Sequence, residues 1–174
     1  MSTKLSFAGK LAALASVAIL VAVTASTTAA QSVRVLERSE AKPLIPTSFK
    51  FEGESAGTQM RNSSAASFGR NRHVAVGLVD NSGYSTDAAK EYEGFFITGL
   101  AVRVGGVRLA KGSYAFGFLK NGTVKFRSST GKASAVASTK KDTDLKRPRP
   151  LMLTVVNGEL RFYKGREYVV VKAD

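Results

Sequence analysis

From Gly94 onward, the chain consists of short runs in which apolar residues recur at every second position, separated by Gly or Asn-Gly. The runs are FFITGLAVRV, VRLAKG, SYAFGFLK, TVKFRSS, ASAVAS, LMLTVV, ELRFYK and EYVVVK. Short runs of this kind, rich in β-branched and aromatic residues, are typical of antiparallel strands joined by tight turns. The pattern predicts an all-β fold, a single antiparallel β-sandwich or small barrel with at most one short helix.

The chain before Gly94 is less regular. SFKFEG at 48–53 and HVAVGLVD at 73–80 predict two strands, the second of them apolar on both faces. The stretch 54–71 is rich in Ser, Ala, Gly and Asn without apolar periodicity, which predicts a long loop. STDAAKEYE at 85–93 is the one helix candidate, with a Ser or Thr as its N-cap.

The first thirty residues have the layout of a secretory signal peptide. Lys4 and Lys10 precede an apolar run at 11–23, and the small residues TTAA stand before Gln31. The run is shorter than the roughly 20 residues that span a bilayer, so a cleaved signal is favoured over a retained anchor. The sequence therefore predicts a signal peptide at 1–30, an N-terminal extension or edge strand at 31–46, and the antiparallel β domain at 47–174.

Composition and charge narrow the possible locations and partners. The chain has no cysteine, which excludes disulfides and a lipoprotein anchor, and together with the Ala-rich signal favours a bacterial periplasmic or secreted protein. Without Lys4 and Lys10 the 26 basic residues become 24, against 13 acidic ones, so the net charge is +11. Such an excess favours anionic partners, and export favours anionic polysaccharide or the envelope surface over nucleic acid. No membrane span is expected in the mature protein, and its oligomeric state stays open.

The turn residues fix which side chains share a face in two hairpins. A three-residue loop at Lys120-Asn121-Gly122 opposes Phe118 with Val124 and Phe116 with Phe126, giving one apolar face. A two-residue turn at Asn157-Gly158 opposes Leu153 with Phe162 in the same way. We therefore expect five residues in the core: Phe116, Phe118, Phe126, Leu153 and Phe162.

A third turn, Gly105-Gly106, brings two cations together. Its two-residue register opposes Arg103 with Arg108, and like charges opposed across strands destabilise a sheet unless an anion bridges them. Lys125 and Arg127 point outward from the neighbouring hairpin at 113–128, and the loop 140–150 adds further cations. The first four candidates are interpreted as one basic sheet face, and the loop is expected to overhang it. The candidate anion-binding residues are Arg103, Arg108, Lys125, Arg127, Lys146, Arg147 and Arg149.

The run LAKGSYAFGF at 109–118 contains an L-x-x-G-x-Y strand entry, and KRPRPL and YKGREYVVV follow it. With these motifs, the stretch 94–171 resembles a small group of uncharacterised exported bacterial all-β domains. The motifs encode a turn and core aromatic residues. The resemblance implies a β-sandwich or small barrel and an exported location, and it implies no activity.

The residues that carry most catalytic or metal chemistry are sparse. His73 is the single histidine, so with no cysteine a structural zinc site is excluded. No G-x-S-x-G nucleophile motif occurs, and no cofactor is indicated. Asp and Glu residues leave open a carbohydrate-active hydrolase, which needs two suitably spaced carboxyl groups. The favoured interpretation is a non-enzymatic exported β-domain that associates with anionic envelope or extracellular polymers.

Overall fold

The computed structural model describes residues 32–82, 91–131 and 134–174. Its elements are β1 (Arg34–Val35), α1 (Arg38–Ala41), the 3-10 helix η1 (Lys42–Leu44), β2 (Ser48–Phe51), β3 (Glu54–Ser67), β4 (His73–Val79), β5 (Gly94–Thr98), β6 (Val102–Val104), β7 (Val107–Leu109), β8 (Gly112–Leu119), β9 (Thr123–Ser128), β10 (Ser134–Ser138), β11 (Lys140–Lys141), β12 (Arg149–Val156), β13 (Glu159–Gly165) and β14 (Glu167–Ala173). The prediction of an all-β fold is confirmed.

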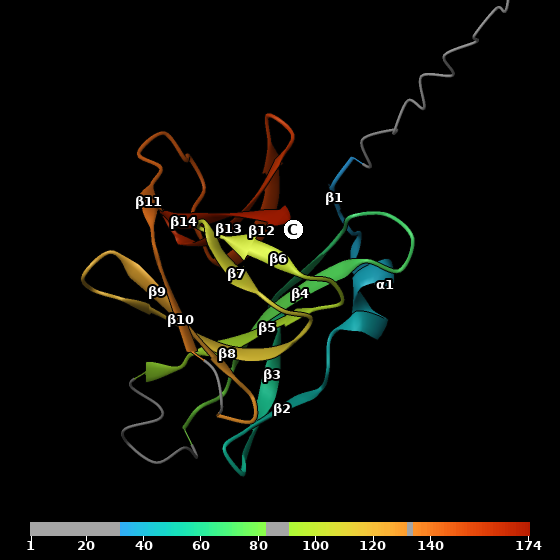
Figure 1. Cartoon of the computed structure of the whole chain (residues 1–174), viewed down its shortest axis with the longest axis vertical. Coiled ribbons are helices and arrows are strands. Elements are labelled where there is room, and N and C mark those ends of the chain that lie inside the picture. The colour runs from blue at the N-terminus through green and yellow to red at the C-terminus, as the bar shows by residue number, and fades with distance from the viewer. Residues whose placement is uncertain (1–31, 83–90, 132–133) are drawn as a thin grey trace, which may run out of the picture. The chain divides into compact units, whose positions relative to one another are not determined.

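The strands form two antiparallel sheets that lie face to face (Figure 1). The first has the order β1-β3-β4-β5-β8-β9-β10, with β2 also paired to β3. The second has the order β12-β13-β14-β6-β7, with β11 also paired to β14. At one side of the pair, β12 of the second sheet lies against β1 and β3 of the first, and at the other side β7 lies against β10. The first of these two seams becomes important below.

The main core fills the space between the sheets. Four of the five predicted core residues, Phe116, Phe126, Leu153 and Phe162, are buried there. Phe118 is partly buried and packs against the same cluster, with its ring centroid 5.4 Å from that of Phe162. The alternating apolar positions of the two hairpins therefore face inward as predicted.

A second core covers the outer face of the first sheet. It joins Phe49 of β2 and Phe95 of β5, whose ring centroids lie 5.5 Å apart, to Ile45 and Ala41 from the segment around α1 and η1. The first sheet is thus covered on both faces, which explains why the strand at His73–Val79 is apolar on both faces. The segment expected to be an extension or edge strand supplies β1 and part of this second core.

The three predicted turn geometries all occur. Phe118 lies opposite Val124 across the Asn121-Gly122 loop, where Gly122 has a φ of +74°. Asn157 and Gly158 have φ values of +51° and +77°, and Leu153 lies opposite Phe162. Positive φ at both central residues is the mark of a type I′ turn, which matches the right-handed twist of the strands.

The predicted loop at 54–71 is wrong, because most of it is the longest strand of the fold. Ala65 and Ala66 of β3 are fully buried, and small side chains suit a strand that is covered on both faces. The register of β3 with β4 shifts between Thr58 and Ser63. This irregularity removes the period-two pattern that would have revealed the strand.

Apart from Glu91, which lies within the predicted helix at 85–93, the helical residues described lie elsewhere than predicted. The helix candidate at 85–93 falls almost entirely outside the described residues. Instead, α1 and η1 follow β1, with Pro43 in the first turn of η1, where its missing N–H costs no hydrogen bond. Neither of them, nor any other helix in the described ranges, has the length and apolar character needed to cross a bilayer.

Candidate anion-binding groove

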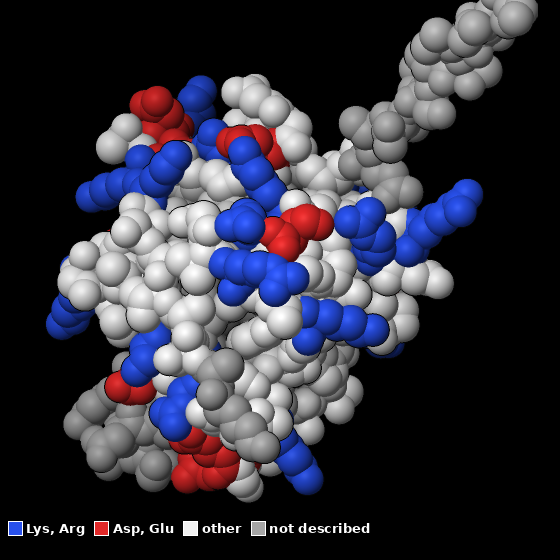
Figure 2. Space-filling view, viewed as in Figure 1, with Lys and Arg blue, Asp and Glu red and all other residues white. Residues whose placement is uncertain are grey.

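The two arginines predicted to oppose each other do so, and a carboxylate of the protein bridges them. Arg103 and Arg108 lie opposite each other in β6 and β7. The Nε atom of Arg103 is 2.8 Å from Oδ1 of Asp174, and that of Arg108 is 2.5 Å from Oδ2. Figure 2 shows acidic atoms enclosed by basic side chains on this face. The anion expected at this turn is therefore supplied by Asp174.

Asp174 is placed there by the sheet. It follows β14, which pairs with β6, and its backbone N–H donates to the carbonyl oxygen of Ala101 at 3.0 Å. Its side chain is only 19% exposed. The hydrogen bond from Arg108 is the largest cause that lowers the pKa of the Asp174 carboxyl below its ordinary value of 3.8.

We expect Asp174→Asn to lower the melting temperature modestly at pH 7, because Arg103 and Arg108 would then oppose each other without a bridge. A carboxyl group whose pKa is lower in the folded state than in the unfolded state stabilises the fold at any pH above its unfolded-state pKa. This stabilisation is lost as the pH falls through the folded-state pKa. Thermal melts from pH 7 to pH 2 should therefore show the difference between wild type and variant shrinking below about pH 4. Equal melting at pH 7 would contradict the bridge.

Lys125 and Arg127 lie in β9 of the first sheet, whereas Arg103 and Arg108 lie in the second. The expectation of one basic sheet face shared by these four residues is therefore wrong. Lys125 Nζ is 2.9 Å from a carboxylate oxygen of Glu91, and Arg127 Nη2 is 2.6 Å from one of Glu52. All four of these cations thus already have a carboxylate partner.

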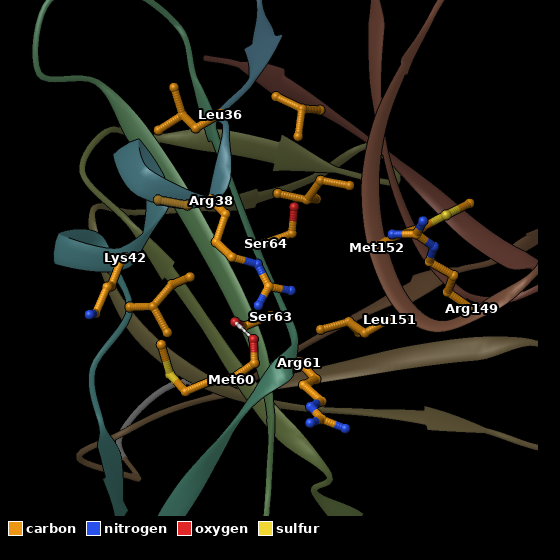
Figure 3. A pocket seen from close by; sticks show the side chains of 14 residues that line it. Leu36, Arg38, Lys42, Met60, Arg61, Ser63, Ser64, Arg149, Leu151 and Met152 are labelled. Atoms are coloured by element: carbon orange, nitrogen blue, oxygen red, sulfur yellow. Dashed lines mark hydrogen bonds between the residues drawn. The ribbon is translucent and has the colours of Figure 1, made fainter.

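A groove at the seam between β3 and β12 gathers cations of a different kind (Figure 3). It has a volume of about 490 Å³. Four elements each contribute one cation: Arg38 from α1, Lys42 from η1, Arg61 from β3 and Arg149 from β12. In Figure 3, Arg38 and Arg149 extend toward the opening from opposite walls. We call this feature the seam groove.

The irregularity in β3 places Arg61 in the seam groove. Residues between Thr58 and Ser63 have no register partner on β4, and their own side chains hold the backbone. The Asn62 side-chain amide donates to Gln59 at 2.8 Å, and the Ser63 hydroxyl donates to the carbonyl oxygen of Met60 at 2.8 Å. A bulge of this type changes the direction of the side chains that it contains. Met60 and Arg61 are consequently presented to the groove.

The first helical turn after β1 places Arg38 and Lys42. Ala41 and Ile45 on the same segment are buried in the second core and anchor it to the sheet. Both Nη atoms of Arg34 donate to the Glu40 carboxylate, at 2.8 and 2.7 Å. The hydrogen bond from Arg34 is the largest cause that lowers the pKa of Glu40 to about 2. Glu40 is thus engaged by Arg34, and no ion pair joins it to Arg38 in the described structure.

Arg149 is the one predicted anion-binding residue that lines the seam groove. The segment before it is fixed by Arg166, whose Nη1 donates to the carbonyl oxygens of Thr143 at 2.9 Å and Leu145 at 2.6 Å. Lys146 and Arg147 lie in the same segment and are exposed, but they do not line this groove. The predicted set of seven cations is therefore distributed over several places.

The four groove cations differ from Arg103, Arg108, Lys125 and Arg127 in their ionic partners. Within the described ranges, no carboxylate lies within ion-pair distance of any of them. The described lining also contains no Asp or Glu side chain. Arg38, Lys42 and Arg61 were absent from the prediction, because they come from segments with no pattern linking them in the sequence. Several cations around one opening without a counter-charge produce a positive potential that attracts anions.

Metal-binding chemistry finds no support in the described part of the chain. It contains no group of three or more His, Asp or Glu side chains that could hold a metal ion. His73, at the first position of β4, lies opposite Ser67 of β3. The cations that line the seam groove suit recognition of negative charge.

No family model, curated protein or solved structure matches this chain.

Proposed function

We propose that this protein is an exported, non-enzymatic β-domain that binds an anionic envelope or extracellular ligand in the seam groove. The observation that carries the proposal is that one groove is lined by Arg38, Lys42, Arg61 and Arg149, none of which has a carboxylate partner among the described residues. In contrast, Arg103 and Arg108 share the carboxylate of Asp174, and Lys125 and Arg127 are each paired with a Glu. The signal-like layout of residues 1–30 and the absence of cysteine support the exported location.

The alternative interpretation, a hydrolase that uses two carboxyl groups, has less support at this site. Glycoside hydrolysis requires an acid and a second carboxylate on either side of the scissile bond. The described lining of the seam groove offers arginine, lysine, serine and apolar side chains instead. These groups can hold a charged ligand in place, and binding without turnover is the function that they support best.

We expect Arg61→Ser/Arg149→Ser to weaken binding of an acidic polysaccharide such as polygalacturonate by at least about tenfold, since each hydrogen bond to a charged group contributes enough for that factor. Isothermal titration calorimetry at several salt concentrations measures the affinity of the wild type and of the variant. Wild-type affinity should also fall as salt rises, because exposed charges are screened over a Debye length of about 8 Å at physiological ionic strength.

The matched control is Arg103→Ser/Arg108→Ser, which removes the same number of arginines and leaves the net charge equal. Because Asp174 already occupies these arginines, the control should retain most of the wild-type affinity. Equal loss of affinity in both double variants would mean that binding depends only on net charge. A greater loss of affinity in the control would place the binding site at the β6–β7 turn. Either result would overturn the proposal.

A further inference from the structure

The seam groove is not only basic. Beneath its cations lie Leu36, Ile45, Leu151 and Leu153, which are buried, and Met60 and Met152, which are more accessible. Figure 3 shows Met60 and Leu151 on opposite walls, with Arg38 reaching between them. The groove therefore presents an apolar floor and a cationic rim within one opening.

Met60 makes the apolar part accessible to a ligand. Only two large hydrophobic side chains in the described structure are exposed, Met60 at 39% and Val136 at 52%. Val136 lies on β10 and outside the groove, whereas Met60 belongs to the irregular part of β3 that also presents Arg61. Methionine side chains are flexible and polarizable, and they adapt to ligands of irregular shape. The irregular part of β3 thus contributes both a cation and an exposed apolar side chain to the groove.

The dimensions fit a small ligand with two chemically different parts. A volume of about 490 Å³ lies within the range of small-molecule sites, which are mostly apolar with a few placed polar groups. A purely polar acidic polysaccharide would form ion pairs with the cations and leave the apolar floor exposed to water. A molecule with an acidic head and an acyl chain would pair with the cations and cover the floor, which is favourable in proportion to the apolar area removed from water.

We propose that the seam groove binds a single anionic amphiphile, in which a phosphate or carboxylate head meets Arg38, Arg61 and Arg149 and an acyl chain lies against Met60, Leu151 and Met152. This inference rests on the proposed function and specifies the ligand class of the same site. The amphiphile is held as a monomer, because the groove is a confined opening at a strand seam and not a broad exposed face.

The experiment measures the binding of four probes to the full exported protein: dodecyl phosphate, inorganic phosphate, dodecyl maltoside and polygalacturonate. The two dodecyl compounds are kept below their critical micelle concentrations. Dodecyl phosphate should bind at least about tenfold more tightly than inorganic phosphate, which lacks the chain, and than dodecyl maltoside, which lacks the charge. Met60→Ser should weaken dodecyl phosphate about tenfold and leave inorganic phosphate unchanged. Val136→Ser, which alters the other exposed hydrophobic residue, should change neither.

The outcomes separate this inference from the function on which it rests. If polygalacturonate binds through Arg61 and Arg149 but dodecyl phosphate binds no better than inorganic phosphate, the amphiphile is overturned and the anion-binding function stands. If the binding of polygalacturonate and the binding of dodecyl phosphate are both independent of Arg61 and Arg149, the amphiphile inference and the anion-binding function are both overturned. Equal weakening of dodecyl phosphate by Met60→Ser and Val136→Ser would place the chain outside the groove and would also overturn the inference. Circular dichroism melts of each variant verify that the fold is retained.

Discussion

Replacing Phe162 with alanine is expected to lower the free energy of unfolding by about 3–5 kcal/mol, the range for truncating a buried aromatic side chain. Phe162 of β13 is fully buried between the sheets. Its ring centroid lies 5.0 Å from that of Phe116, 5.4 Å from Phe118 and 5.8 Å from Phe96. The second sheet thus contacts the first through this ring, and its loss leaves a cavity that both sheets line. Urea denaturation of the purified protein measures the effect.

The control for this substitution is Val136→Ala, which shortens an exposed side chain of similar hydrophobic character. Exposed substitutions of this type change stability by no more than about 0.5 kcal/mol. A Phe162→Ala protein that unfolds at the same urea concentration as Val136→Ala would contradict the packing of the two sheets described above.

A second large effect is expected from adding one methyl group at Gly94. In β5, Gly94 lies opposite Phe116 of β8 and Leu78 of β4. A Cβ atom at Gly94 would lie 2.2 Å from the carbonyl oxygen of Gly77 and 2.8 Å from the Phe116 ring. Because backbone in the middle of a sheet cannot move aside cheaply, Gly94→Ala should destabilise the fold by about 3 kcal/mol, at the upper end for overpacking. Thermal unfolding measured by circular dichroism tests this.

Gly57→Ala provides the matched control, since Gly57 is also a strand residue and no atom lies within 4 Å of its added Cβ. This variant should be neutral or slightly stabilising, because alanine reduces the conformational freedom of the unfolded chain. If the two alanine variants were equally stable, the close approach of Phe116 to the backbone of β5 would not exist.

The hairpins could be predicted from the sequence because two local signals agree there. Alternation fixes the face of each side chain, and the Asn-Gly and Gly-Gly turns fix the register, so a shift of one residue would expose every core aromatic residue. In β3 both signals are missing. Its small residues show no apolar period, and the irregularity between Thr58 and Ser63 interrupts the alternation. Only pairing with β2 and β4 makes this stretch a strand.

The sequence alone predicts the chemistry of the seam groove but not the set of residues that forms it. The net charge indicated an anionic partner, and Arg149 was among the candidate residues. The partners of Arg149 come from α1, η1 and β3, which the chain brings to the seam through long-range pairing. Conversely, Arg103 and Lys125 looked available in the sequence, yet Asp174 and Glu91 lie beside them in the fold. Which cations are neutralised is a property of tertiary structure.

The most direct test of the anion-binding groove is a nuclear magnetic resonance titration of the ¹⁵N-labelled protein with a short oligogalacturonate. The amide and side-chain signals of Arg38, Arg61, Ser64 and Arg149 should shift together and saturate with one dissociation constant, while those of Arg103 and Arg108 stay in place. Shifts centred on β6 and β7, or small shifts spread over all basic residues without saturation, would contradict a binding site at the seam between β3 and β12.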